Sequence, residues 1–411
     1  MGYTIAEKII AKHVGHPVRA GELVVTPVDG VMATDTTAPL AIKAFKEMGG
    51  QKVFDPEKFA LIIDHAAPSP NERIANLHKL MRDFAREQNS RLFEIGEGIC
   101  HQVMVEEAYV KPGDIFIGAD SHTPTYGALN AFACGVGSTD LAATMMTGKI
   151  WLKVPQTIQV ICHGKLQEGV TAKDLILFLV GKITVSGATY KAIEFTGEAF
   201  EGLSLSSRMT IANMSSEMGA KAGIVNPTGL ELDYAFDPVK ADADAEYIKT
   251  YEFDVSGLEP QVSAPESPDN VHNISGYEGT KIDYAFIGTC CNGRLEDIDI
   301  AAKILRGKKI HPNVRMVIAP ASKSVLLDAM KNGSMETLIN AGASLITSGC
   351  GPCVGTHQGV PADGEVVISA ANRNFRGRMG NPNSNIYLGA PSSVAAAALE
   401  GKIVNPKKYL V

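Results

Sequence analysis

The chain has 411 residues, which predicts two or three domains at about 150 residues per domain. Its net charge of −7 disfavours nucleic acid and anionic lipid as partners, because both attract basic proteins. The longest clearly apolar stretch, residues 175–180, is far shorter than the roughly 20 residues that a membrane-spanning helix needs. We therefore expect a globular protein that binds neither nucleic acid nor a membrane.

The N-terminal residues predict a helix rather than a targeting segment. Thr4 and Glu7 have the spacing of a capping box, whose hydroxyl and carboxylate bind free amides at the start of a helix that continues through Ile10. Because this segment has no apolar signal core, we interpret Met1 as the start of a cytoplasmic protein. The seven cysteines, an odd number without a secretion signal, argue against a disulfide framework.

Short apolar runs that end in chemically reactive residues recur along the chain, a pattern typical of strands buried in a parallel sheet. Helical segments at 297–305 and 323–331 give the last third a β-α-β-α order. The pattern predicts an α/β fold with mostly parallel sheets. Ligands of open α/β sheets bind beyond the carboxyl ends of the strands, so we expect an active site between domains. The strands are predicted at residues 61–63, 115–117, 285–287, 345–346 and 366–368.

Two proline-containing segments indicate domain boundaries. Residues 260–275 combine three prolines with several Ser, Asp and Asn residues and predict a linker. A weaker boundary is predicted at Val154-Pro155.

The sharpest local motif is Cys350-Gly351-Pro352-Cys353, for which we consider three interpretations. The two thiols could simply pack in a core turn. They could form a thioredoxin-type redox switch, but that requires a long helix starting at the first cysteine, and the glycines from Gly355 onward would break it. They could also bind a metal centre, with Cys290 at the end of another strand as the third ligand. Structural zinc normally takes four protein ligands, whereas three thiolates suit an iron–sulfur cubane with one open iron.

Histidines next to carboxylates follow two of the predicted strands, as Asp64-His65 and Asp120-Ser121-His122, and His101 lies between them. Any single histidine is more often an ordinary hydrogen-bonded polar group than a catalyst. The consecutive Asp-Ser-His cannot be a hydrolase triad, since neighbouring side chains diverge. Several histidines near strand ends favour a role in moving or orienting protons.

Three arginines gather around one aromatic residue in segment 372–378. A solvated basic turn is the simplest interpretation. Because a guanidinium binds carboxylates through two parallel hydrogen bonds, a small acidic substrate is the alternative that we favour. An open iron, acid–base histidines and carboxylate-binding arginines together suit the reversible loss of water from a hydroxy-polycarboxylate.

Four long segments resemble the aconitase superfamily, and more closely the large subunits of its 3-isopropylmalate dehydratase and homoaconitase branch. The segments are IGADSHTPTYGALNAFACGVGSTD, FIGTCCNGRLEDI, SGCGPCVG and NRNFRGR. The resemblance implies three α/β domains around a central cluster, which we place at residues 1–155, 156–265 and 266–411.

The same resemblance implies one [4Fe-4S] cluster per subunit, held by Cys290, Cys350 and Cys353, with one iron left open for the substrate. It pairs Asp64 with His65, Asp120 with His101, and Glu217 with His122, and it assigns to His65 the protonation of the departing hydroxyl. The residues implied for catalysis are Asp64, His65, His101, Asp120, His122 and Glu217. Those implied for substrate binding are Ser121, Asn213, Asn372, Arg373 and Arg378.

Two positions depart from the family pattern. Thr34 stands where the family usually has Gln or His, which places that polar contact in question. Cys291 stands where the family often has Thr, so a second thiol follows the ligand Cys290 and either substitutes for it or packs.

The family also has a fourth, swivelling domain that carries a catalytic serine base, and the chain ends shortly after Arg378. We therefore expect a separate small subunit, in a heterodimer or a heterotetramer. The implied substrate is a hydroxy-di- or tricarboxylate, foremost 3-isopropylmalate in leucine biosynthesis. Homoaconitate, a methylmalate and 2,3-dimethylmalate are the alternatives. An iron-responsive RNA-binding regulator is a rival of a different class, which the acidic charge disfavours.

Overall fold

The computed structural model describes residues 2–410; Met1 and Val411, the outer ends of the first and third predicted domains, lie outside the described residues. The first large sheet has five parallel strands in the order β4-β3-β2-β5-β6. Nearly all its residues are buried, as expected when helices cover both faces. Its strands are β2 (Gly30–Thr34), β3 (Phe59–Ile62), β4 (Arg91–Phe93), β5 (Ile115–Gly118) and β6 (Phe132–Gly135). Its helices are α2 (Ala38–Glu47), α3 (Glu72–Gln88), α4 (Cys100–Glu106) and α5 (Ser138–Thr147), with the 3₁₀ helix η1 (Thr123–Leu129).

The second large sheet has four parallel strands in the order β10-β9-β8-β11. Its strands are β8 (Thr157–His163), β9 (Ala192–Thr196), β10 (Ala222–Val225) and β11 (Lys249–Asp254). Its helices are α6 (Ala172–Ile183), α7 (Glu198–Glu201) and α8 (Leu205–Met214), followed by η2 (Ser215–Met218). A separate antiparallel ribbon pairs β1 (Leu23–Pro27) with β7 (Lys149–Lys153).

The third large sheet has seven strands in the order β13-β12-β18-β17-β14-β15-β16. Its strands are β12 (Gln261–Ser263), β13 (Val271–Asn273), β14 (Tyr284–Gly288), β15 (Arg315–Ala319), β16 (Ser344–Leu345), β17 (Val366–Ser369) and β18 (Asn385–Gly389). Its α-helices are α9 (Thr289–Asn292), α10 (Leu295–Leu305), α11 (Lys323–Lys331), α12 (Ser334–Ala341) and α13 (Pro391–Glu400). Its 3₁₀ helices are η3 (Ile274–Tyr277), η4 (Gly351–Val354) and η5 (Pro406–Tyr409).

The predicted α/β class with mostly parallel sheets is confirmed, and each of the five predicted strands coincides with an observed one: β3, β5, β14, β16 and β17. The prediction that 260–275 is a linker is wrong. Strand β12 in this segment pairs antiparallel with both β13 and β18, and its Val262 is fully buried. The prolines flank these short strands, where a missing amide costs little, so they do not prevent pairing.

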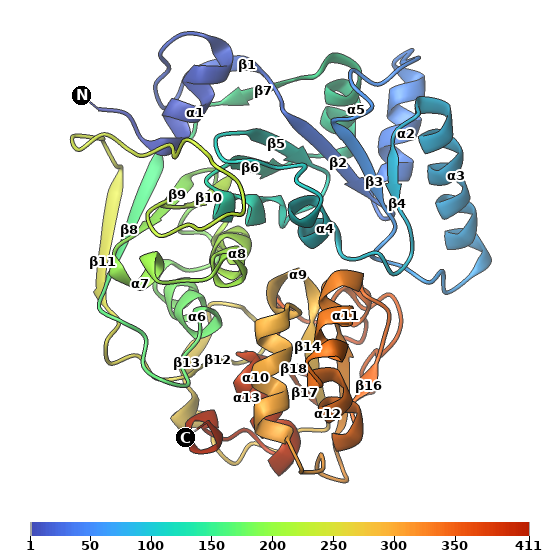
Figure 1. Ribbon diagram of the computed structural model, residues 1–411, viewed down its shortest axis with the longest axis vertical. Helices are drawn as coiled ribbons and strands as arrows, with labels where there is room; N and C mark the ends of the chain where they lie inside the picture. The colour runs from blue at the N-terminus through green and yellow to red at the C-terminus, as the bar shows by residue number, and fades with distance from the viewer. Residues whose placement is uncertain (1, 411) are drawn as a thin grey trace.

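The three large sheets meet at the middle of the molecule. In Figure 1 the first two sheets occupy the upper part and the third the lower part, with α9 between them. Helix α9 contacts both α4 and α8. One apolar core runs through all three units and includes Phe116, Ile176 and Tyr284. Of the helices within residues 2–410, none combines the length and hydropathy needed to cross a bilayer.

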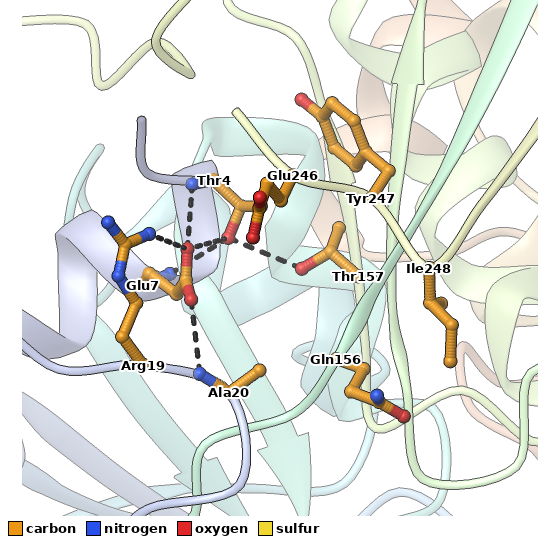
Figure 2. A pocket seen from close by; sticks show the side chains of 9 residues that line it. All are labelled: Thr4, Glu7, Arg19, Ala20, Gln156, Thr157, Glu246, Tyr247 and Ile248. Carbon is orange, nitrogen blue, oxygen red and sulfur yellow. Dashed lines mark hydrogen bonds and ion pairs between the residues drawn. The ribbon is translucent and has the colours of Figure 1, made fainter. Parts of the chain in front are cut away.

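Helix α1 (Ile5–Val14) begins with the predicted capping box. The Glu7 amide donates to the Thr4 hydroxyl at 3.3 Å, and the Thr4 amide donates to Glu7 Oε2 at 3.0 Å. Figure 2 shows Glu7 also accepting from the Ala20 amide, beside a cavity of about 530 Å³. None of the site residues predicted from the sequence lines this cavity.

Replacement of the capping residue tests this local account of α1. We expect Thr4→Ala to lower the free energy of unfolding by about 1 kcal/mol, because a helix amide loses its acceptor. Lys12→Ala, an exposed change on the same helix, is the control and should stay within about 0.5 kcal/mol of wild type. Chemical denaturation followed by circular dichroism measures both variants. An equal loss of unfolding free energy in Thr4→Ala and Lys12→Ala would contradict the role of Thr4 as the cap of α1.

Candidate active site

Cys290 lies in α9, a single tight turn that directly follows β14. Thr289 has φ 77°, a left-handed conformation that β-branched residues rarely adopt and that costs on the order of 1–3 kcal/mol. The Arg294 guanidinium, 1% exposed, stabilises the turn by donating to the carbonyl oxygens of Cys290 and Cys291. The strained backbone thereby fixes the direction of the Cys290 thiol.

Cys350 and Cys353 lie around η4, on a loop pressed against the end of β3. The Cys350 amide donates to the Asp64 carbonyl oxygen at 2.8 Å. A Cβ atom on Gly349 would lie 2.4 Å from the same oxygen, so this approach requires glycine. The 3₁₀ helix η4 has four residues and ends at Val354, and the next residue, Gly355, has φ 70°, so the long helix that a thioredoxin-type switch needs does not start at Cys350.

Two asparagines link the cysteines. Asn213 Nδ2 lies 3.2 Å from Cys290 Sγ, and Asn372 hydrogen-bonds to Asn213. Asn372 also lies between two thiols, with Nδ2 3.7 Å from Cys290 Sγ and Oδ1 3.7 Å from Cys353 Sγ. Segments from the second and third sheets therefore meet at the sulfur atoms.

The donor set fits an anionic metal cluster. Cys290, Cys350 and Cys353 are free and at most 5% exposed. The hydrogen bond from Cys350 and the charge of Arg378 hold the pKa of the Cys353 thiol well below its usual value, which favours the thiolate. Arg378 Nη2 lies 3.6 Å from Cys353 Sγ, whereas its buried Nε has no acceptor within residues 2–410. A partly buried guanidinium whose Nε is buried and still free to donate suits a negatively charged group.

His65 stands between three carboxylates. Its Nδ1 lies 2.8 Å from Asp64 Oδ1, its Nε2 lies 3.4 Å from Asp120 Oδ2, and its amide donates to Asp35 at 2.8 Å. Burial alone would lower the pKa of His65, but the charge of Asp64 and the contact with Asp120 raise it well above its usual value. This imidazole is therefore held protonated.

His101 pairs with the same Asp120, at 2.7 Å from Nε2 to Oδ1, and its Nδ1 lies 3.4 Å from the Tyr126 hydroxyl. Burial would raise the pKa of Asp120, but His101 and His65 lower it well below its usual value. The largely buried carboxylate of Asp120 thus contacts two histidines.

His122 has the opposite electrostatic setting. Its Nε2 lies 2.8 Å from Glu217 Oε1, and Arg373 Nε lies 2.9 Å from both Glu217 oxygens. Burial and the charge of Arg373 lower the pKa of His122, although Glu217 opposes them. The surroundings of His122 and of His65 therefore shift the two pKa values in opposite directions.

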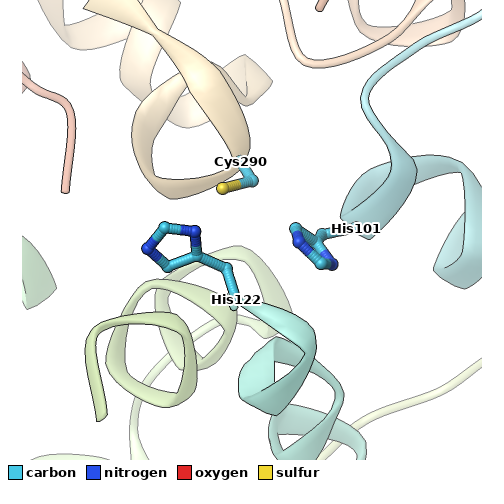
Figure 3. Close-up of side chains that lie close together, drawn as sticks. All are labelled: His101, His122 and Cys290. Carbon is cyan, nitrogen blue, oxygen red and sulfur yellow. The ribbon is translucent and has the colours of Figure 1, made fainter. Parts of the chain in front are cut away.

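Figure 3 shows the rings of His101 and His122 on either side of Cys290. One ligand atom from each of these three residues lies within 4.8 Å of the others, as do those of Asp35, Asp64 and His65. The first group joins the histidines to the cysteine site; the second is the hydrogen-bonded network around His65.

The structure brings together every site residue predicted from the sequence except the side chain of Ser121. Ser121 is exposed, and its carbonyl oxygen accepts from the Ser216 hydroxyl at 2.8 Å. Thr34 is buried and lies within hydrogen-bond distance of the hydroxyls of Thr36 and Thr37. The Cys291 thiol lies 3.3 Å from Lys173 Nζ, so it packs in a site of its own.

Sequence reasoning missed four buried residues of this region: Asp35, His78, Lys173 and Arg294. Asp35 follows β2 as Asp64 nearly follows β3, and this parallel was the available signal. The burial of Lys173 and Arg294 had no signal in the sequence, because Lys173 in the first turn of α6 and Arg294 at the N-cap of α10 are charged residues next to acidic neighbours.

The strand ends of this α/β fold bring three thiols together with paired histidines and carboxylates. This combination defines a hydro-lyase of the iron–sulfur class. The chain belongs to the aconitase family: the family model "Aconitase family (aconitate hydratase)" matches residues 7–401. Membership implies an iron–sulfur cluster.

Several relatives within this family match the chain over nearly its whole length. The chain is 50% identical to the 3-isopropylmalate dehydratase large subunit of Hydrogenobaculum sp. (strain Y04AAS1), over 99% of this chain and 98% of that one. It is 50% identical to the probable methanogen homoaconitase large subunit of Methanosarcina mazei, over 93% and 99%. It is 46% identical to the homoaconitase large subunit of Thermus thermophilus, over 99% and 98%. Aconitase X (holo-form) of Thermococcus kodakaraensis shares the fold, with TM-score 0.52, 15% identity and coverage of 86% and 85%.

The network around Asp35 predicts a pH-dependent stability. Burial alone would raise the pKa of Asp35, but the hydrogen bond from His78 and the charge of His65 lower it from 3.8 to about 2. A depressed folded-state pKa means that the carboxylate stabilises the fold fully above pH 3.8 and less as the pH falls toward 2. We expect Asp35→Asn to cost roughly 2 kcal/mol at pH 7, and this cost to shrink between about pH 4 and pH 2.

Urea denaturation of both proteins across this pH range measures the difference. Asp237→Asn, at an exposed position, is the control and should change little at any pH. A cost that is absent at pH 7, or that grows below pH 4, would contradict the role of Asp35.

Proposed function

We propose that the chain is the large, cluster-bearing subunit of a hydro-lyase that reversibly dehydrates or isomerises 3-isopropylmalate. The observation that carries the proposal is that three buried thiols lie beside three histidine–carboxylate pairs, in a chain 50% identical to a 3-isopropylmalate dehydratase large subunit. Loss of water from this substrate class needs both a polarised hydroxyl and a proton donor.

The cluster of the proposal is [4Fe-4S], one per chain, held by Cys290, Cys350 and Cys353. Three thiolates leave one iron of a cubane without a protein ligand. When bound, such a cluster supplies a Lewis acid that polarises the substrate hydroxyl and a carboxylate. The cationic Arg378 next to Cys353 and the amide of Asn213 next to Cys290 support this assignment.

We assign proton donation to the departing hydroxyl to His65 Nε2. The raised pKa keeps His65 protonated, and Asp64 at Nδ1 stabilises the imidazolium and fixes the ring. As the carbon–oxygen bond breaks, transfer of this proton lets the hydroxyl leave as water. Asp120, which also binds His101, orients the His65 ring from its Nε2 side and stays ionised.

We assign carboxylate binding to Arg373 and Arg378, with Asn213, Asn372 and Ser121 as polar contacts. Arg373 is oriented by both oxygens of Glu217, which leaves its terminal nitrogens for a substrate carboxylate. Glu217 also holds His122, so one carboxylate orients an arginine and a neutral histidine. The group that removes the substrate proton belongs, in this proposal, to a small subunit.

We propose that this small-subunit partner carries the swivelling domain. Support comes from the relatives, whose names specify a large subunit and whose length this chain spans almost fully. The proposed division into residues 1–155, 156–265 and 266–411 matches the large sheets, whose strands come from 30–135, 157–254 and 261–389, except that β12 (Gln261–Ser263) belongs to the third sheet although it precedes the boundary at 265. Seven free cysteines favour a reducing, cytoplasmic location.

Homoaconitase is the second candidate, because two of the similar large subunits carry that name at 46% and 50% identity. The reaction and the site residues would be the same. The two candidates differ in the side chain of the hydroxy acid.

A reconstitution assay tests the function. The chain is co-expressed anaerobically with the small subunit encoded in the same genome, and 3-isopropylmalate and homoaconitate are supplied separately. We expect the complex to convert 3-isopropylmalate with the higher kcat/KM, and the chain without the small subunit to show less than about 1% of that rate, because a proton acceptor is missing. Preference for homoaconitate would establish the second candidate, and turnover of neither acid would refute both.

Cluster assembly gives a second prediction. After anaerobic reconstitution we expect about four iron and four sulfide ions per wild-type chain, and less than about one of each in Cys350→Ala, because a cubane corner loses its thiolate. Cys134→Ala removes an equally buried thiol in β6 and should load as wild type. Chemical iron and sulfide analysis measures all three. Full loading of Cys350→Ala, or stoichiometric zinc without sulfide, would refute the ligand set.

A further inference from the structure

Lys173, the second residue of α6, is fully buried, and all three of its ammonium protons have acceptors. Its Nζ lies 3.3 Å from Cys291 Sγ, 3.1 Å from the carbonyl oxygen of Ala370 and 2.7 Å from that of Ala371. A fully buried lysine is rare, because its charge and its long side chain both favour water.

The three acceptors belong to the two segments that hold the proposed site. Cys291 directly follows Cys290, and Ala371 directly precedes Asn372, whose amide lies between Cys290 and Cys353. One side chain on α6, a helix of the second unit, therefore joins α9 to the loop after β17. Both segments of the third sheet converge on its single positive charge.

No carboxylate forms an ion pair with this ammonium within residues 2–410. The adjacent Asp174 instead accepts from the amides of Gln261 and Thr171, and burial raises its pKa to about 6. Arg294 repeats the pattern from the other side: it is 1% exposed and donates to the carbonyl oxygens of Cys290 and Cys291. Two buried cations thus flank the Cys290–Cys291 turn without forming a carboxylate ion pair within residues 2–410, and the nearby carboxylates that attract them, Asp174 and Asp297, are held by backbone amides.

We propose that Lys173 is a positioning residue and a buried counter-charge for the anionic cluster. This inference rests on the proposed function. Lys173 forms no ion pair with a carboxylate within residues 2–410, and in the proposed function the three cluster thiolates supply the negative charge near it. In a low-dielectric interior a cation one residue away from a ligand stabilises the loaded state and makes the cluster easier to reduce. Its hydrogen bonds at the same time fix the turn after Cys290 and the backbone before Asn372.

The test compares Lys173→Met, which keeps length and removes charge, with Lys173→Arg, which keeps charge. Lys182→Met, an exposed change on the same helix, is the control. Each protein is reconstituted anaerobically, and its iron content, its cluster midpoint potential and its melting temperature before and after loading are measured. None of these readouts depends on turnover.

We expect Lys173→Met to shift the midpoint potential to a more negative value and to lose iron several-fold faster than wild type on exposure to a chelator. We also expect loading to raise its melting temperature less than it raises that of wild type. Lys173→Arg should stay nearer to wild type in potential, and Lys182→Met should match wild type throughout. If Lys173→Met does not fold, Lys173→Gln, which is uncharged but can still donate hydrogen bonds, takes its place.

Three outcomes overturn the proposal. A loaded Lys173→Met or Lys173→Gln with the wild-type potential and iron-loss rate would leave Lys173 a packing residue only. An equal shift in Lys173→Arg would show that charge is not the cause. A wild-type chain that takes up no cluster would refute the proposed function and this inference with it, and the iron content of wild type distinguishes that case from the first two.

Discussion

The hydrogen bond from the Cys350 amide to the Asp64 carbonyl oxygen is the contact on which the site depends. It joins the end of β3 in the first sheet to the cysteine loop of the third sheet. Gly349 permits the approach, since any side chain there would overlap the same oxygen. The Asp64 side chain meanwhile binds His65 and the Cys100 amide. One residue therefore sets the distance between the proton-handling groups and the cysteines.

The second sheet contributes the remaining connections. Helix α8 presents Asn213 to Cys290, and η2 presents Glu217 to His122 and Arg373. Helix α6 presents Lys173 to the backbone of the third sheet. Each contact crosses between units whose apolar cores are continuous, so the three sheets form one frame around the site. Such a frame limits reorganisation when charge develops during a reaction.

Neighbouring charges give chemically identical side chains different pKa values. His65 and His122 are both buried histidines beside carboxylates, yet the pKa of His65 is raised and that of His122 is lowered. Asp64 and Asp120 surround the first, whereas Arg373 competes for Glu217 at the second. A histidine whose surroundings favour the protonated form and one whose surroundings favour the neutral form thus both lie near Asp120.

Local patterns in the sequence predicted the α/β class, five strands and the capping box of α1, because short apolar runs and cap motifs depend on neighbouring residues. The family resemblance named the residues that gather at the site, except that the side chain of Ser121 is exposed. The sequence did not determine that 260–275 forms strands, since β12 is stabilised by pairing with the distant β18. Nor did it reveal Asp35 or Lys173 as parts of the network. The direction of each pKa shift and the burial of Lys173 depend on residues that come from different sheets. Electrostatic and packing energies depend on distances in space and not on distances along the chain, so these two properties are set by the tertiary structure.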